Sequence, residues 1–300
     1  AVSAPQYRRA TAHSIYTSGI YLGGALASLS VLLSRAFGWR RAALLVAVSA
    51  LPPMGLLAVS LREGGAMTLE KQPAAAPAAK PRTPPAEPQS LLAVIRQILS
   101  IRSVRWLLAG TTARLFAGIA IGAWVAPYYR TAFPLQAPTF AMANAAIVAG
   151  GGTVAVVCGG IASDRLTIAG KKPERAAYIP MLGALLAIPF WLVAIQSSSF
   201  CLSLAGLLGA YLCAETWFGA TIAMLQAAVP QEISGSAQGL LNVVQIVSSI
   251  SAPLIGALHR RGATLQLLLS VLVPCSYVVT ALCFWRAGSA RAAEANGALR

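Results

Sequence analysis

Residues 106–124 read WLLAGTTARLFAGIAIGAW, nineteen residues with one charged side chain, Arg114. A helix needs about 20 predominantly apolar residues to cross the ~30 Å hydrocarbon layer of a bilayer, so this stretch predicts a transmembrane helix. The whole chain has the same character, because 57% of its 300 residues are hydrophobic and only 10% are charged. Soluble domains carry about 25% charged residues. The composition therefore indicates an all-α polytopic membrane protein and excludes soluble, disordered, collagen-like and coiled-coil chains.

The same criterion predicts eight membrane-spanning helices in all. They are residues 13–34, 42–61, 106–129, 139–162, 177–195, 200–226, 238–258 and 265–285. We expect five segments along the chain: residues 1–61 with two spans, a Pro/Ala-rich cytoplasmic linker at 62–90, an interfacial helix at 91–105, six spans within 106–287, and a cytoplasmic tail at 288–300.

The predicted interfacial helix at 91–105 reads LLAVIRQILSIRSVR. Its apolar side chains fall on one helical stripe, and its three arginines face water. The stripe consists of Leu91, Leu92, Ile95, Ile98 and Leu99, and the arginines are Arg96, Arg102 and Arg105. This pattern predicts a helix that lies on the cytoplasmic leaflet.

The basic residues predict the orientation of the chain. Lys and Arg number 23 against 8 Asp and Glu, a net charge of +15, and they lie between the apolar runs rather than in a nucleic-acid-binding patch. Most of them fall on the side of the membrane that holds both ends of the eight predicted spans. By the positive-inside rule, both termini are predicted to be cytoplasmic. The sequence does not indicate which membrane contains the protein.

A glycine-containing, charged loop joins the fourth and fifth predicted spans. Residues 159–166 read GGIASDRL, and residues 170–172 read GKK. Glycines let helices approach closely, an Asp accepts hydrogen bonds from a helix N-terminus or an Arg, and basic residues stay cytoplasmic. The loop is thus a candidate conformational latch, although any cytoplasmic loop is rich in Lys and Arg. Its candidate residues are Gly160, Asp164, Arg165, Gly170, Lys171 and Lys172.

This loop resembles the cytoplasmic signature of the major facilitator superfamily, with three extra residues at 167–169. The stretches RRATAHSIYTSGIYLGGALASLS at 8–30, AETWFGATIAMLQAAVP at 214–230 and SAQGLLNVV at 236–244 resemble its spinster-like branch. Members of that branch are linked to lysolipids, sphingolipids or other organic solutes. The resemblance implies a major facilitator-type bundle, in which the eight spans are the last two of the N-terminal half and all six of the C-terminal half. Four further spans are then expected before residue 8.

Arg114 and Glu215 are the two charged residues deep within predicted spans. At ~1.5 Å per residue, Arg114 lies ~14 Å and Glu215 ~17 Å from the same face of the membrane. A charge at that depth costs about 2.5 to 3.5 kcal/mol on insertion scales and marks a functional candidate. The resemblance implies that the third and sixth spans face each other, so the two residues are expected to pair.

Two interpretations of this pair stay open. In the first, the pair is a structural tie between helices, or Arg114 is hydrated in a vestibule and binds nothing. In the second, Arg114 contacts an anionic head group while Glu215 tunes it or takes up a proton. The further candidates for substrate binding or coupling are polar or aromatic residues on presumed cavity helices: Asn144, Tyr211, Trp217, Asn242 and Gln245. Asn and Gln in spans also serve to join helices, so this second role stays open for Asn242 and Gln245.

The sequence predicts a transporter rather than an enzyme. It contains no G-x-S-x-G or H-E-x-x-H arrangement and no metal-ligand cysteine spacing, so no cofactor, nucleotide or nucleic acid is expected. We expect secondary active or facilitative transport of a small organic solute by alternating access, with anionic and lysolipid- or sphingolipid-like solutes as candidates and a coupled proton as a possible driving ion. Membrane lipid is the other expected partner. The alternative is a non-transporting eight-span scaffold or interaction protein.

Overall fold

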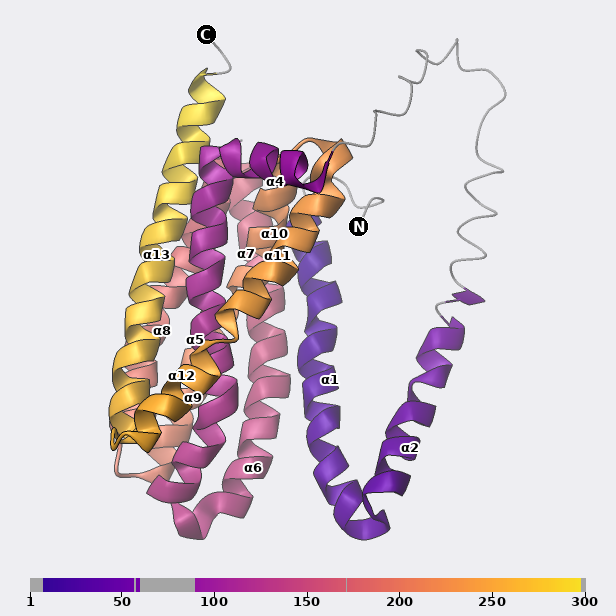
Figure 1. Cartoon of the computed structure of the whole chain (residues 1–300), viewed down its shortest axis with the longest axis vertical. Coiled ribbons are helices and arrows are strands. Elements are labelled where there is room, and N and C mark those ends of the chain that lie inside the picture. Colours follow the sequence, from indigo (N-terminus) through magenta and orange to yellow (C-terminus); the bar gives the residue numbers. More distant parts are fainter. Residues whose placement is uncertain (1–7, 57, 60–89, 171, 298–300) are drawn as a thin grey trace. The chain divides into compact units, whose positions relative to one another are not determined.

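The computed structural model describes residues 8–56, 58–59, 90–170 and 172–297, and every regular element in these ranges is helical (Figure 1). This confirms the predicted all-α class. The chain divides into two compact units, residues 1–25 with 90–300, and residues 26–89. Because the first turns of α1 belong to the larger unit, they and the bundle after residue 90 form the part of the fold that carries the site.

From α4 onward, short connections join successive helices. Their bounds are α1 Arg9–Phe37, α2 Trp39–Ser49, α4 Leu91–Ser100, α5 Arg102–Ala132, η2 Pro134–Gln136, α6 Ala137–Ala146, η3 Ile147–Gly152, α7 Thr153–Gly170, η4 Pro173–Ala177, α8 Tyr178–Gln196, α9 Phe200–Ala214, α10 Trp217–Ala228, η5 Gln231–Ile233, α11 Ser234–Ser248, α12 Ser251–Arg260 and α13 Leu265–Gly297. The segment η3 is a π-helix, and η2, η4 and η5 are 3-10 helices.

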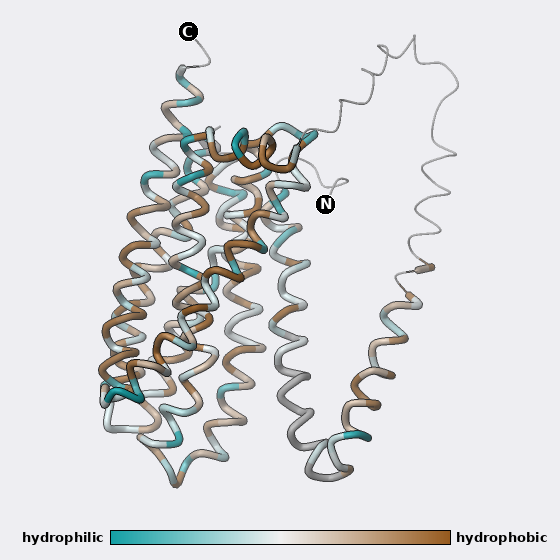
Figure 2. The backbone as a smooth tube through the Cα atoms, in the orientation of Figure 1, coloured by the Kyte–Doolittle hydropathy of each residue, from teal (hydrophilic) through white to brown (hydrophobic). Residues whose placement is uncertain are grey.

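Six helical segments among the described residues are long and apolar enough to cross a membrane. They are Arg102–Ala132, Pro134–Ile168, Glu174–Gln196, Phe200–Ala228, Gln231–Arg260 and Leu265–Gly297. Each contains one of the last six predicted spans. Figure 2 shows hydrophobic residues along these helices and a hydrophilic turn between α12 and α13. The first predicted span lies within α1, whereas the second, 42–61, begins in α2 and runs beyond the described residues.

Close helix packing builds the core of the larger unit. At Gly206 of α9, an added Cβ would lie 2.6 Å from the Ala194 backbone nitrogen and 2.8 Å from the Phe190 carbonyl oxygen of α8. The buried Trp191 side chain of α8 donates its indole N–H to the Leu269 carbonyl of α13, at 2.9 Å. Large apolar side chains such as Leu186 remain exposed on the outer surface, as expected for helices that face lipid.

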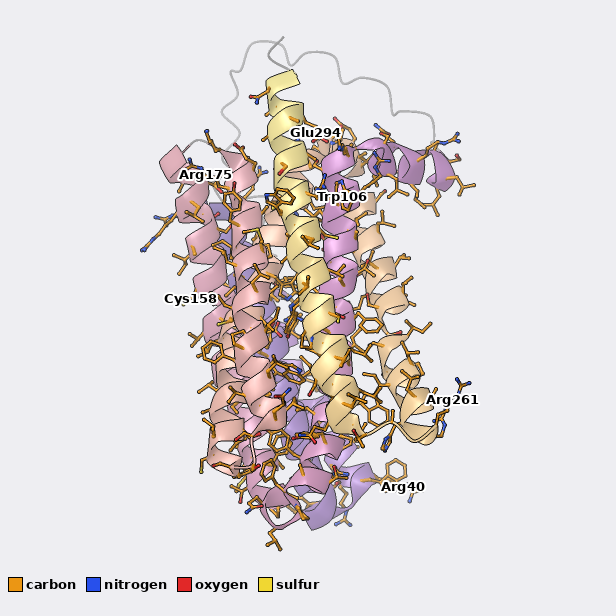
Figure 3. The ribbon with its side chains drawn as sticks, turned by 90° about the vertical axis from the view of Figure 1, so that its left-hand side faces the viewer. Arg40, Trp106, Cys158, Arg175, Arg261 and Glu294 are labelled. Carbon is orange, nitrogen blue, oxygen red and sulfur yellow. The ribbon has the colours of Figure 1, made fainter. Side chains whose placement is uncertain are left out.

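Two ends of this unit can be distinguished in Figure 3, which labels Arg175, Trp106 and Glu294 toward one end and Arg261 at the opposite end. At the Glu294 end, α13 extends past α5. The Glu294 carboxylate accepts the Ser103 N–H at 2.9 Å and the Ser103 hydroxyl at 2.7 Å, and thereby caps the first turn of α5. The predicted tail at 288–300 is therefore helical as far as Gly297.

Three of the six membrane-length segments are irregular within the apolar region. The second contains the π-helix Ile147–Gly152, the fourth is interrupted at Glu215 and Thr216, and the fifth is interrupted at Ser249 and Ile250. The last break has a simple cause, because Pro253 has no N–H to donate to a carbonyl four residues earlier. Irregular backbone inside a membrane protein is tolerated where other protein groups form hydrogen bonds with its free N–H and C=O groups. We therefore expect such groups beside each break.

Candidate functional site

The interruption between α9 and α10 brings Arg114 and Glu215 together. Helix α9 ends at Ala214, and Glu215 leaves the regular helix with φ −86° and ψ 6°. Arg114 of α5 reaches this break from the side. Its Nε donates to the Ala214 carbonyl at 3.1 Å, and its Nη2 donates to Glu215 Oε1 at 2.7 Å. One guanidinium thus satisfies both the carbonyl at the helix end and the carboxylate.

The pair is largely removed from solvent. The Arg114 side chain is 2% exposed and that of Glu215 is 16% exposed. The Arg114 guanidinium carbon also lies 5.6 Å from the ring centroid of Trp217 and 5.5 Å from that of Tyr277, within range of a cation–π attraction. Charge-assisted hydrogen bonds and ring faces together offset part of the cost of burying the two charges.

Tyr21 of α1 completes a chain of three side chains. Its hydroxyl donates to Glu215 Oε2 at 2.6 Å, so both carboxylate oxygens are engaged. The Tyr21 ring lies against Gly152 at the end of the π-helix, where an added Cβ would clash with ring carbons. Sequence reasoning missed Tyr21, because tyrosines are common in spans and nothing in their spacing singled this one out. The chain Tyr21–Glu215–Arg114 therefore links α1, the broken helix and α5.

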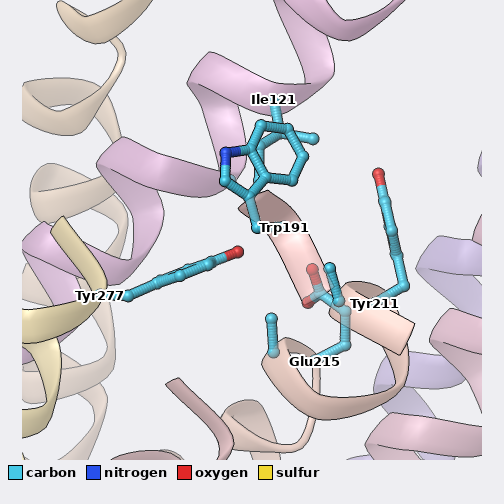
Figure 4. A pocket seen from close by; sticks show the side chains of 8 residues that line it. Ile121, Trp191, Tyr211, Glu215 and Tyr277 are labelled. Carbon is cyan, nitrogen blue, oxygen red and sulfur yellow. The ribbon is translucent and has the colours of Figure 1, made fainter. Parts of the chain in front are cut away.

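A small cavity lies beside these three hydrogen-bonded side chains (Figure 4). Its lining comes from four helices: Gly118, Ile121, Trp191, Ala210, Tyr211, Ala214, Glu215 and Tyr277. Figure 4 shows the Tyr277 hydroxyl and the Glu215 carboxylate facing the space beside Trp191. The cavity has room for about one water molecule. Arg114 is not part of its lining, so Glu215 is the charged group that the cavity meets in this conformation.

The other predicted binding residues do not all lie at this cavity. Tyr211 lines the cavity, and Trp217 packs beside Arg114. Asn144 lies on α6, where its Oδ1 is buried, and neither this atom nor Trp217 Nε1 has a hydrogen-bond partner among the described residues. Asn242 and Gln245 are exposed on α11 and do not line this cavity.

Asp164, the predicted latch residue on α7, sits at the start of α1. Its carboxylate accepts the Ala10 N–H at 3.2 Å, the Thr11 N–H at 2.8 Å and the Thr11 hydroxyl at 2.6 Å. The first backbone N–H groups of a helix have no partner within the helix and attract negative charge. Asp164 therefore acts as a cap that is supplied by another helix.

Two glycines let α1 approach this closely. An added Cβ at Gly160 of α7 would lie 2.8 Å from the Ala10 carbonyl oxygen, and one at Gly219 of α10 would lie 2.6 Å from the same oxygen. Both would also clash with the Ser14 hydroxyl. One turn after Ala10 along α1, His13 Nε2 lies 3.1 Å from Gln226 Oε1. The start of α1 is thus seated on α7 and α10.

The remaining loop residues make no comparable contact with α1 in the part of the chain that the structure describes. Arg165 and Lys172 are exposed, and Gly170 is the last residue of α7. Lys171 lies outside the described residues.

Replacing Asp164 with alanine is expected to destabilise the chain by about 0.5 to 2 kcal/mol, the usual cost of losing an N-cap side chain. Asn at this position keeps an oxygen acceptor and is expected to cost less. Thermal unfolding of the detergent-solubilised protein would measure both, with Arg165→Ala as a control on the neighbouring exposed residue. Equal melting temperatures for Asp164→Ala and the control would contradict the capping role.

Comparison with known proteins agrees with this architecture. The family model described as Major Facilitator Superfamily matches residues 1–253 of the 300. No curated protein matches the chain. The match covers α1, the loop at residues 159–172, the π-helix Ile147–Gly152 and the interruptions at residues 215–216 and 249–250. With an all-helical fold and six membrane-length apolar segments, the chain belongs to the major facilitator superfamily.

Proposed function

We propose that this protein is a secondary active or facilitative carrier that moves a small organic solute by alternating access, with the chain Tyr21–Glu215–Arg114 at its centre. Family membership indicates membrane transport of small solutes, and members of this family are transporters rather than enzymes. The observation that supports the proposal most directly is the buried ion pair at a broken helix, which a tyrosine of α1 shares. Charged residues within spans commonly mark solute or proton pathways.

The proposed mechanism follows from how the carboxylate is shared. Glu215 holds α1 through Tyr21 and holds α5 through Arg114, at 2.6 and 2.7 Å. Loss of the negative charge on Glu215 by protonation would weaken both hydrogen bonds together, and α1 would then be free to move relative to α9. A proton taken up at Glu215 would in this way be coupled to a change of conformation.

Arg114 suggests the class of solute. In this conformation its guanidinium is engaged by Glu215 and by the Ala214 carbonyl. A phosphate or carboxylate on the solute would have to displace Glu215, and that exchange would also release Tyr21. We therefore propose an anionic solute, with lysolipid- or sphingolipid-like molecules of the spinster-like branch as candidates. Solute binding and proton uptake would then act on the same three residues.

Transport measurements on the protein in its full natural length test this proposal. In proteoliposomes, Arg114→Gln is expected to reduce uptake of anionic solutes at least about tenfold, since a charge-assisted hydrogen bond of about 1.5 to 3 kcal/mol is lost. The control is Arg130→Gln, because Arg130 is exposed in the last turn of α5. Unaltered uptake of every anionic solute by folded Arg114→Gln protein would rule out the anionic-solute role.

Glu215→Gln separates coupling from binding. A glutamine keeps hydrogen-bonding atoms but cannot gain or lose the carboxyl proton. We expect uptake by this variant to become insensitive to an imposed pH gradient. A response to the gradient equal to that of the unaltered protein would remove Glu215 from the coupling path. If the unaltered protein is folded and inserted but shows no flux of any solute, the result would favour the alternative, a non-transporting scaffold.

The proposed topology places the last two spans of an N-terminal half in residues 1–61 and a six-span half in 106–287, with both termini of this chain cytoplasmic. Impermeant thiol reagents applied to intact cells test the orientation. A cysteine at Arg102 is expected to react only after permeabilisation, and a cysteine at Arg261 is expected to react directly. The reverse pattern would overturn the orientation.

A further inference from the structure

Helix α4 lies crosswise at one end of the bundle (Figure 1). It begins at Leu91, after Ser90, whose hydroxyl oxygen accepts the Ala93 N–H at 3.3 Å. It ends at Ser100, because Ile101 is extended with φ −74° and ψ 115°. Residues 102–105, which the sequence assigned to the same interfacial helix, instead form the first turn of α5. The chain therefore turns a corner between a crosswise helix and a membrane-length helix.

Among the described residues, the bundle covers only part of the apolar face of α4. Val94 and Ile98 are buried in a core cluster that includes residues of α5, α10, α11 and α13. Leu91, Leu92 and Leu99 are 70%, 77% and 39% exposed. At about 100° per residue, Leu92 and Leu99 lie only about 20° apart around the helix, so they form one edge. Leu91 lies about 80° to 100° from them, on the side of Ile98. We call Leu92 and Leu99 the open edge of α4.

Arginines border the open edge on its solvent side. Arg96 follows Leu92 by one turn, about 40° further around the helix, and it is exposed. Arg102 and Arg105, in the first turn of α5, are exposed at the same corner. Two carboxylates of the described residues lie on adjoining elements. That of Glu294 is engaged by the N–H and hydroxyl of Ser103 and by Arg291 at 3.7 Å, and that of Glu232, next to Ile233 of the same core cluster, is on an exposed residue of η5.

We propose that this corner binds anionic phospholipid of the cytoplasmic leaflet, with the open edge among the acyl chains and Arg96, Arg102 and Arg105 on the lipid phosphates. A guanidinium forms paired hydrogen bonds with phosphate, and an amphipathic helix of this kind lies in the interface with its apolar side at the acyl boundary. Trp106, 36% exposed and next in sequence to Arg105, is of the residue type that gathers at that level.

The arrangement fits a bilayer better than a protein partner. The open edge is narrow and belongs to a helix whose Val94 and Ile98 side chains already pack on the bundle. It stands at one end of the bundle (Figure 1), and its border is cationic. A juxtamembrane cluster of arginines is attracted to the negative surface of a cytoplasmic leaflet. The corner thus offers apolar side chains and cationic groups side by side, as a lipid with acyl chains and a phosphate requires.

Lipid binding by matched variants tests the proposal. The test variant carries Arg96→Gln, Arg102→Gln and Arg105→Gln, and the control carries Arg130→Gln, Arg260→Gln and Arg261→Gln, three exposed arginines remote from α4 that change the net charge equally. The purified protein is placed in nanodiscs of phosphatidylcholine with or without phosphatidylglycerol. The preference for phosphatidylglycerol among co-purifying lipids is measured by mass spectrometry.

We expect the test variant to lose the phosphatidylglycerol preference by at least about tenfold, from about fivefold per arginine at the surface, while the control keeps it. An equal loss in both variants would contradict the proposal, because it would reflect net charge alone. A third variant, Leu92→Gln with Leu99→Gln, tests the open edge. It should raise hydrogen exchange of residues 90–100 in lipid, and unchanged exchange would mean that another part of the protein, rather than acyl chains, covers the edge.

Discussion

Replacement of Glu215 with alanine is expected to destabilise the folded protein by about 3 to 5 kcal/mol, the usual cost of removing one partner of a buried ion pair. The reason is Arg114, which is 2% exposed and would keep its charge without the carboxylate that now offsets it. The Tyr21 hydroxyl would lose its acceptor as well. Thermal or denaturant unfolding in lipid or detergent would measure the loss. Glu232→Ala, on an exposed acid of η5, is the control and should be nearly neutral.

A paired replacement shows what the ion pair contributes. Arg114→Met combined with Glu215→Leu removes both charges and is expected to recover most of the stability that Glu215→Ala loses, since apolar residues of similar volume often replace buried pairs without penalty. A double variant no more stable than Glu215→Ala would mean that the loss comes from something other than the unpaired arginine. If the stable double variant also retains flux, the pair is a structural tie. If flux disappears while stability returns, the pair serves transport.

Replacement of Gly219 with valine is expected to separate the start of α1 from α7 and α10. The new side chain would meet the Ala10 carbonyl oxygen, 2.6 Å from its Cβ, and would overlap the Ser14 hydroxyl. Overpacking typically costs 1 to 3 kcal/mol, and here the displaced element is backbone that also receives the Asp164 cap. We therefore expect a loss at or above the upper end of that range.

Hydrogen exchange of a peptide covering residues 9–21 reports this separation directly. Its amides should exchange faster in Gly219→Val, because the contacts of Asp164 and Tyr21 with α1 would be weakened together. Gly122→Val on α5 and Gly239→Val on α11 are matched controls, because an added Cβ meets no atom within 4 Å at either glycine. Faster exchange in the controls to the same extent would show that valine in a helix, rather than the contact with α1, causes the effect.

The spans could be predicted from sequence because membrane insertion depends on a local property, the length of an apolar run. The predicted span 106–129 lies within α5, Arg102–Ala132, and the other five behave similarly. The approach of Arg114 to Glu215 was also predicted, because 1.5 Å per residue converts sequence position into depth and the family resemblance implied that the third and sixth spans face each other. Depth alone does not fix rotation about a helix axis. Asn242 and Gln245 lie within a predicted span but are exposed on α11.

The backbone irregularities were not predictable in the same way. The break after Ala214 is stabilised by Arg114, 100 positions before Ala214 in the chain, and the contact of Tyr21 with Gly152 joins residues that are even further apart in sequence. Local sequence contains no record of such partners. The capping of α1 was partly foreseen, since a helix N-terminus was one of the two expected partners of Asp164, but which helix would supply it was not.

The π-helix at Ile147–Gly152 has a consequence for the whole of α7. Such a turn commonly arises when a single extra residue enters an α-helix, and one residue corresponds to about 100° of helical phase. Deleting one residue there would leave the loop signature intact in the sequence but would swing Gly160 and Asp164 to another side of α7, away from Ala10 and Thr11. A variant that keeps the loop signature but lacks this extra residue should therefore lack the α1 cap.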